Sequence, residues 1–315
     1  MQVYATGGRQ RVDAGLAAWA TGHRPLYDLA VLAALDLDRR VAETALTYRT
    51  PASVCDPDAV GHRFGAASVD GATVVTCTER ERVSIGPDKV VGTATHPWLA
   101  DAHHALSIDG ADWVVATGVD GVVELPRGVF HPVHPSARAP IGDVRSARLP
   151  RARAHPTCVS RVDGALWVTR GVPGDAVELG GEGRGPIAPV TVHDEVVAPD
   201  GVWFTAVDGR LVRVDPATGR VSREVSLADD DPEPLGWCRG LALIDHLALV
   251  GFTRLRTTRW RGRLAWARGR LRGRAAATRR PTRIELWDLR SERRVGVIHV
   301  EAAGLDAVFG IVAVR

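Results

Sequence analysis

One phrase recurs five times along the chain and constrains its fold more than any other feature. Each copy contains a polar or His residue, an apolar stretch, an Asp-Gly pair and a β-rich run, as in HALSIDGADWVVATG from His104. The Asp-Gly pairs begin at positions 70, 109, 163 and 200, and Asp245-His246 continues the series, so the spacings are 39, 54, 37 and 45 residues. This period is typical of a four-stranded propeller blade.

The two ends of the chain predict how the ring closes. The first residues, MQVYATGG, resemble the second strand of another copy, ALWVTRG, but no first strand precedes them. The final segment, AVFGIVAVR, supplies the missing strand. We therefore expect one all-β domain over residues 1–315, a six-bladed β-propeller with four-stranded blades in which the C-terminal strand joins the N-terminal blade.

The expected blades follow from the repeat. They are 1–51 with 306–315, then 62–95, 103–150, 155–190, 193–228 and 236–300. Helix is the main alternative for 14–20 and for 30–37, and neither segment is long enough to change the fold class.

Three segments carry a resemblance to a known family. They are GWCRGLALIDHLALVGFTRLR from Gly236, DGVWFTAVDGRLVRVDPATGRV before it, and the terminal DAVFGIVAVR. Together they resemble an uncharacterised bacterial family of six-bladed propeller-like proteins, a domain of unknown function, most specifically at GWCRGL. The resemblance implies a six-bladed ring and no particular reaction. In more distant six-bladed rings, such as gluconolactonases and peptidyl-amidoglycolate lyases, the site lies at one mouth of the central channel, often around a divalent metal.

Histidines begin four successive expected innermost strands, which converge on the channel of a propeller. They are His62, His104 (or its neighbour His103), His155 and His193. Cys238 and Arg239 occupy the equivalent position in the next blade. The nearest carboxylates, which can orient an imidazole, are Asp194, Glu195 and Asp306.

Three interpretations of these histidines remain open. In the first, His62, His104, His155 and His193 are ligands of zinc or iron in an open site. In the second, one imidazole near its ordinary pKa of about 6.5 acts as a metal-free acid or base beside Arg239. In the third, the rings only hydrogen-bond to neighbouring backbone.

The favoured function is an enzyme that acts on a small anionic metabolite at the channel mouth, as a lyase, isomerase or hydrolase. We expect His155 and His193 to be catalytic and Arg239 to bind the anionic group, with Trp237, Arg254 and Arg256 adding to substrate binding. The alternative is a non-catalytic propeller that recruits a protein partner through its rim and an Arg-rich insertion.

That insertion spans 254–283 and contains 12 Arg, with no acidic residue between His246 and Ile284. Subtracting its charge of +12 from the total of +3 leaves −9 for the rest of the chain. Trp260, Leu264, Ala267 and Leu271 have amphipathic helical spacing. Such a segment can dock a partner, cover the channel, bind an anionic membrane or nucleic acid, or remain a solvated loop. Nucleic acid is disfavoured because the acidic remainder repels phosphate.

Several classes are excluded or disfavoured. No P-loop, G-x-G-x-x-G after a strand, G-x-S-x-G or H-E-x-x-H motif is present, so no nucleotide cofactor is expected. No apolar run reaches 18 residues, which excludes a transmembrane helix. The N-terminus lacks the basic and apolar regions of a secretory signal, so we expect a cytoplasmic protein.

Other singled-out residues have structural interpretations. Cys55, Cys77, Cys158 and Cys238 lack metal or redox spacing and are expected to be small buried hydrophobes. Trp113, Trp167 and Trp203 recur after the Asp-Gly pairs and are expected to pack between blades. His131 and His134 lie in a Pro-rich connection and are expected to be loop residues.

Overall fold

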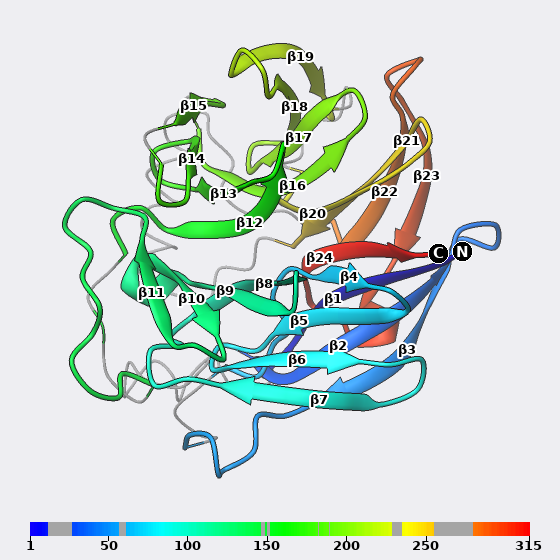
Figure 1. Ribbon diagram of the computed structural model, residues 1–315. Coiled ribbons are helices and arrows are strands. Elements are labelled where there is room, and N and C mark those ends of the chain that lie inside the picture. Colours follow the sequence, from blue (N-terminus) through cyan, green and yellow to red (C-terminus); the bar gives the residue numbers. More distant parts are fainter. Residues whose placement is uncertain are drawn as a thin grey trace, which may run out of the picture.

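The computed structural model describes residues 1–11, 27–56, 61–145, 149, 152–181, 183–188, 190–228, 235–254 and 280–315. These residues form six four-stranded antiparallel sheets arranged as blades around a ring (Figure 1). The predicted fold class, an all-β six-bladed propeller, is confirmed.

Each blade runs from an innermost to an outermost strand. Blade 1 contains β24 (Ala307–Val314), β1 (Gln2–Gln10), β2 (Tyr27–Asp36) and β3 (Val41–Tyr48). Blade 2 contains β4 (Ser68–Asp70), β5 (Thr73–Cys77), β6 (Glu81–Ile85) and β7 (Val90–Thr95). Blade 3 contains β8 (Ala102–Ile108), β9 (Ala111–Ala116), β10 (Gly121–Leu125) and β11 (Val129–Pro132).

The remaining blades have the same order. Blade 4 contains β12 (Pro156–Val162), β13 (Ala165–Arg170), β14 (Asp175–Glu178) and β15 (Arg184–Pro186). Blade 5 contains β16 (Val192–Ala198), β17 (Gly201–Ala206), β18 (Arg210–Asp215) and β19 (Arg220–Ser226). Blade 6 contains β20 (Trp237–Ile244), β21 (Leu247–Thr253), β22 (Arg283–Asp288) and β23 (Arg293–His299).

Ring closure depends on strands from both ends of the chain. β24 pairs antiparallel with β1 from Gln2 opposite Val314 to Gly8 opposite Ala307. The N and C labels accordingly lie side by side in Figure 1. The segment 30–37, for which helix was the alternative, lies mostly in β2 because strand pairing on both sides satisfies its backbone.

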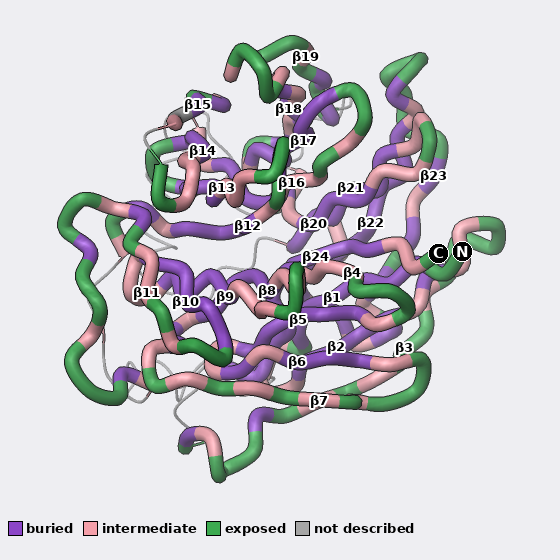
Figure 2. The backbone as a smooth tube through the Cα atoms, viewed as in Figure 1, coloured by how far each residue is buried: buried purple, intermediate pink, exposed green. Residues whose placement is uncertain are grey.

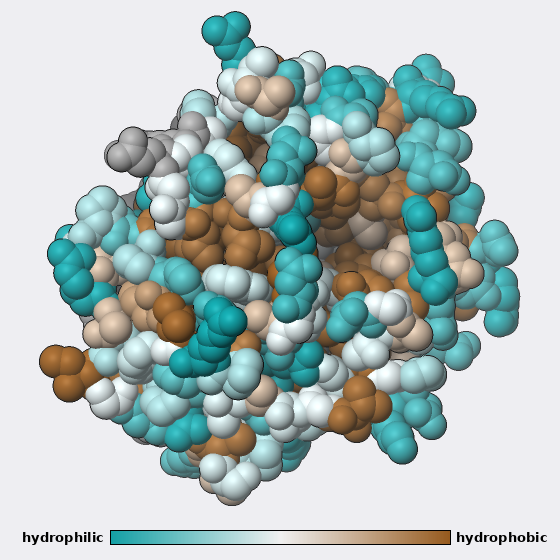
Figure 3. Space-filling view, in the orientation of Figure 1, coloured by the Kyte–Doolittle hydropathy of each residue, from teal (hydrophilic) through white to brown (hydrophobic). Residues whose placement is uncertain are grey.

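The hydrophobic core is divided between neighbouring blades. One cluster joins Trp203 of blade 5 to Leu241 and Trp287 of blade 6, and comparable clusters lie between the other blades. Inner strands are therefore mostly buried, whereas outer strands such as β7 alternate between half-buried and exposed residues (Figure 2). Figure 3 shows apolar side chains in recessed areas of one face, with hydrophilic side chains around them.

A buried threonine in each second strand, or directly after it, adds polar contacts inside the ring. The Thr6 hydroxyl donates to the Gly65 carbonyl of blade 2 at 2.7 Å, and the Thr253 hydroxyl accepts from the Val308 N–H of β24 at 3.0 Å. The set is Thr6, Thr76, Thr117, Thr169, Thr205 and Thr253.

Several structural expectations can now be compared with the fold. All four cysteines are free and buried, as expected. Trp203 is buried between blades, whereas Trp113 and Trp167 are only half-buried. The loop prediction for His131 is wrong, because His131 lies in β11 and pairs with Val122 of β10. In the part of the chain that the structure describes, no helix has the length and apolar character needed to cross a membrane.

Candidate functional site

A cavity of about 700 Å³ lies where the inner strands of four neighbouring blades begin. Blades 3, 4 and 5 contribute residues at or just before the start of the inner strand together with the turn between the second and third strands, which antiparallel pairing places at the same end, and blade 6 contributes the start of β20. The lining includes Asp101 and Gly118 of blade 3, His155 and Val172 of blade 4, His193 and Val207 of blade 5, and Trp237 and Arg239 of blade 6.

His193 and Asp194 form a buried pair at this cavity. The Nδ1 atom of His193 lies 2.9 Å from Oδ2 of Asp194, and the same oxygen accepts the Gly240 N–H at 2.7 Å. The His193 and Gly240 contacts hold the pKa of Asp194 below its usual range despite burial, so this carboxylate is ionised. Nδ1 therefore carries the proton that it donates to Asp194. Nε2 of His193 is buried and has no hydrogen-bond partner among the described residues.

Two further imidazoles lie against this pair. The ring centroid of His103 is 5.9 Å from that of His193 and 5.1 Å from that of His155. Nδ1 of His103 donates to the backbone carbonyl of Asp101 at 2.8 Å, the arrangement expected for a neutral ring. Burial lowers the pKa of all three rings, and that of His155 falls to about 4, so they are neutral near pH 7.

His155 is held in place through its backbone. Its φ is 51°, a left-handed conformation unusual for a residue with a side chain. The carboxylate of Asp120 accepts the N–H groups of Arg153, Ala154 and His155 at 2.7, 3.0 and 3.0 Å. This cap stabilises the turn that brings His155 to the cavity.

The cavity also holds a cation that lacks a carboxylate partner. The Arg239 guanidinium lies 4.3 Å from the ring centroid of Trp237 and 5.1 Å from that of Phe309, and it forms no salt bridge with any described residue. Burial lowers its pKa to about 10, which leaves it protonated at neutral pH. Arg63 lies 4.5 Å from the Phe309 centroid but is paired with Asp101 at 2.9 Å.

Several predicted site residues lie elsewhere. Nδ1 of His104 accepts the Val159 N–H at 3.1 Å and the ring also hydrogen-bonds to the backbone of Ala67, so His104 joins blades 2, 3 and 4. Nδ1 of His62 accepts the Thr50 N–H at 3.2 Å. Neither ring is among those that line the cavity.

The predicted arginines of the insertion also do not join the site. Arg254 pairs with Glu301 at 2.7 Å and does not line the cavity. Arg256 and the apolar stripe of the insertion fall within 255–279, outside the described residues. His134 is half-buried, with Nδ1 2.8 Å from the Ser136 hydroxyl, and the Asp306 carboxylate accepts the Gln10 N–H at 2.8 Å.

The predicted zinc or iron site can be tested against the residues present. Within the described ranges, no three His, Cys, Asp or Glu side chains are placed to hold a metal ion. Two guanidinium groups, Arg63 and Arg239, flank Phe309 beside the imidazoles. Nearby positive charge disfavours a cation, so the site fits an anion better than a metal. The metal stays a prediction, and no step below depends on it.

Sequence reasoning did not identify Arg63, Asp101 or Asp120. His62 and Arg63 precede β4, which begins only at Ser68, so the available signal for Arg63 was its place beside a predicted site histidine. His62 is turned into the blade, and Arg63 next to it approaches Phe309. No comparable signal existed for Asp120, whose contacts depend on a left-handed turn.

Many solved structures share the fold. A protein of unknown function from Bacteroides caccae matches with a TM-score of 0.60 at 12% identity, over 100% of this chain and 99% of its own. A chain of a nidogen/laminin complex gives 0.53 at 11% identity, over 99% of this chain and 97% of its own. AztD from Citrobacter koseri gives 0.50 at 11% identity, over 100% and 99%.

At these identities the similarity shows the fold alone. No protein-family model matches the chain, and no curated protein matches it at a significant level. The resemblance of the GWCRGL block to an uncharacterised bacterial family therefore stays a prediction.

Proposed function

We propose that the chain is an enzyme that binds a small anionic metabolite in the channel cavity and removes a proton from it with His193. The observation that carries this proposal is the free Nε2 of His193. It is buried at a cavity that also holds the guanidinium of Arg239, while Nδ1 is fixed by Asp194.

The charges of the site favour an anionic ligand. Among the described lining residues, Arg239 has no carboxylate partner, whereas the acid Asp101 is neutralised by Arg63. A carboxylate or phosphate group would pair with Arg239, whose stacking on Trp237 limits its movement. The guanidinium is itself buried, which strengthens this attraction relative to water.

Proton transfer then follows from the His193–Asp194 geometry. A C–H bond next to the bound carboxylate breaks, its proton passes to Nε2, and the electron pair moves into the substrate as an enolate-like system. Asp194 stabilises the imidazolium that forms, as a carboxylate does in other His-Asp pairs. His155, neutral at pH 7, is available as a hydrogen-bond donor to the developing oxyanion.

Two outcomes complete the reaction. In a lyase a group on the neighbouring carbon leaves with its bonding electrons, and in an isomerase the proton returns at another position. Hydrolysis would use the same base on a water molecule. The expected interaction scaffold depends on residues 255–279, outside the described residues, and stays the alternative.

Hydrogen–deuterium exchange tests the proposal across a panel of candidate substrates. Small carboxylates and phosphorylated metabolites are incubated with the protein in D₂O, and loss of C–H signals is followed by proton NMR. We expect one compound class to exchange with the wild type and not with His193→Gln. The matched control is His299→Gln, an exposed histidine on β23. Exchange that persists in His193→Gln would overturn the assignment.

A further inference from the structure

A second pocket opens between blades 4 and 5, on the opposite face of the ring. Its volume is about 360 Å³, and its rim contains Asp163 and the turn 216–219. Asp163 lies in the turn between the first two strands of blade 4, and 216–219 joins the last two strands of blade 5. The channel cavity uses the turns between second and third strands, which antiparallel pairing places at the other end.

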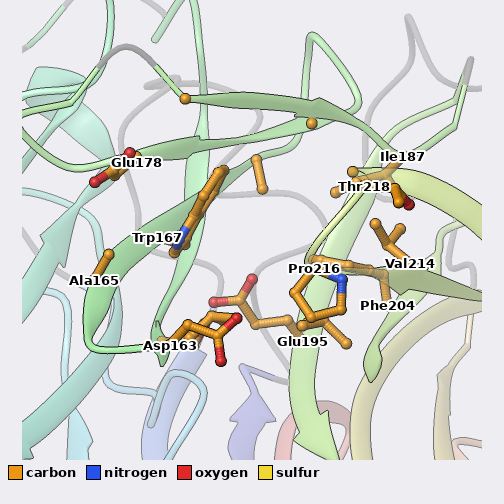
Figure 4. A pocket seen from close by; sticks show the side chains of 17 residues that line it. Asp163, Ala165, Trp167, Glu178, Ile187, Glu195, Phe204, Val214, Pro216 and Thr218 are labelled. Atoms are coloured by element: carbon orange, nitrogen blue, oxygen red, sulfur yellow. The ribbon is translucent and has the colours of Figure 1, made fainter. Parts of the chain in front are cut away.

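The walls of this pocket are mostly apolar. Trp167 of β13 lies on one side and Phe204 of β17 on the other (Figure 4). Further apolar lining comes from Val162, Ala165, Ala176, Ile187, Val202, Val214 and Pro216. Trp203, which occupies the corresponding place in blade 5, is instead only 1% exposed against blade 6. The half-buried Trp167 thus leaves its indole available to a ligand.

Glu195 places a carboxyl group among these apolar residues. Its Oε2 accepts from the Thr169 hydroxyl, and the Ser160 and Cys158 side chains also interact with the carboxyl group. Oε1 is buried and forms no hydrogen bond of regular geometry with the described residues. Figure 4 shows the carboxyl group inside the pocket, near Trp167 and Asp163. A buried acceptor without a regular hydrogen bond is unfavourable, so a ligand that donates to it would gain this interaction.

The repeat makes this carboxyl group an exception. Glu195 pairs with Phe204, and the residues with the same register in blades 3, 4 and 6 are Ala105, Val159 and Leu241. Three blades therefore place an apolar side chain where blade 5 places an acid. The packing of a blade does not require a carboxylate at this position, which indicates a role outside folding.

We propose that this pocket binds a small organic cation, with its ammonium or amidinium group on Glu195 and its apolar body between Trp167 and Phe204. Every ionisable side chain in the described lining is acidic: Asp163, Glu178 and Glu195. An indole face also attracts a cation. The site is separate from the channel cavity and does not depend on the proposed proton transfer.

Calorimetric titration with three matched probes tests this site at pH 8, above the pKa of about 7 to which burial raises that of Glu195. Phenethylamine is the cation, 3-phenylpropanol the neutral analogue and 3-phenylpropionate the anion. We expect phenethylamine to bind at least tenfold more tightly than the other two. Equal binding of the three, or no binding of the amine at 10 mM, would overturn the proposal.

Two variants separate the carboxyl group from the pocket. Glu195→Gln should raise the dissociation constant of phenethylamine at least tenfold. Gly185→Val should also block it by filling the pocket, and a Cβ at this glycine meets no atom within 4 Å, so the fold should be retained. His193→Gln, at the other face, should bind the amine like the wild type. Unchanged binding in both pocket variants would refute the site.

Discussion

The backbone N–H of Gly240 in blade 6 donates at 2.7 Å to the Asp194 carboxylate in blade 5. The oxygen that orients His193 is thus anchored by the neighbouring blade. Asp194→Asn keeps the shape but replaces an ionised acceptor with an amide that no longer stabilises an imidazolium. We expect the proton-exchange rate to fall by about 10²–10⁴-fold, with an unchanged circular dichroism spectrum. Wild-type exchange in Asp194→Asn would contradict the proposed role of this pair.

Arg239→Met should weaken binding of the anionic substrate while retaining the apolar stacking on Trp237. The expected loss is about 10- to 100-fold in KM, since a charge-assisted contact contributes about 1.5–3 kcal/mol. Steady-state kinetics measure it once the exchanging compound is known. Arg254→Met is the control, because Arg254 pairs with Glu301 away from the cavity. An equal effect in both variants would indicate a general charge effect.

Asp120 is predicted to be a positioning residue for His155. Asp120→Ala removes the acceptor of three N–H groups, so the left-handed turn should loosen. We expect kcat to fall about tenfold or more with little change in KM, and the unfolding free energy to fall by about 1–2 kcal/mol. Asp120→Asn keeps one acceptor oxygen and should recover part of kcat. A stability loss without any change in kcat would leave Asp120 as a structural residue only.

Acid should destabilise the fold through buried histidines. Burial lowers the pKa of His104 to about 4, from an ordinary value of 6.5. The unfolded chain therefore binds a proton between these values that the folded chain does not. This contribution is complete above pH 6.5 and is lost as the pH falls toward 4. Urea unfolding at pH 8, 6 and 5 should show a shallower pH dependence in His104→Gln than in the wild type, and parallel curves would contradict the prediction.

Glu195 should have the opposite pH dependence. Burial raises its pKa to about 7 from 4.5, so the folded chain retains a proton that the unfolded chain has lost. Its contribution is complete below pH 4.5 and is lost as the pH rises through 7. At pH 8, Glu195→Gln should therefore gain stability relative to the wild type, by about 1–3 kcal/mol, and this gain should shrink to under about 1 kcal/mol at pH 5. A gain that is independent of pH would point to packing instead.

The ring itself could be predicted because its cause is local and repeated. The sequence shows each Asp-Gly turn and the β-rich run after it. It also shows that the N-terminal segment lacks a first strand and that the C-terminal segment supplies one. Side-chain direction at the channel could not be predicted in the same way. A register shift between Ala102 and His104 in β8 determines which neighbouring histidine reaches the other imidazoles, and it is His103. Such a bulge leaves no mark in a hydrophobic pattern.

The second pocket shows a similar limit. Trp167 and Trp203 occupy equivalent places after their Asp-Gly turns, and pattern alone assigns both to the core. Only the packing of neighbouring blades separates them, since Trp203 is covered by blade 6 and Trp167 borders a cavity. The sequence places Glu195 among the carboxylates near the ring, but its isolation among apolar walls depends on residues distant in sequence.

The strand that completes blade 1 follows every other strand in the sequence, although it lies innermost in its sheet. Gln2 meets Val314 only when nearly the whole chain is available, which makes this pairing slow to form. Until then β1 presents an open edge, and the β24 segment of another chain carries the matching hydrogen bonds. Refolding at high concentration should therefore yield strand-exchanged dimers with native-like blades, whereas dilution should favour closed monomers.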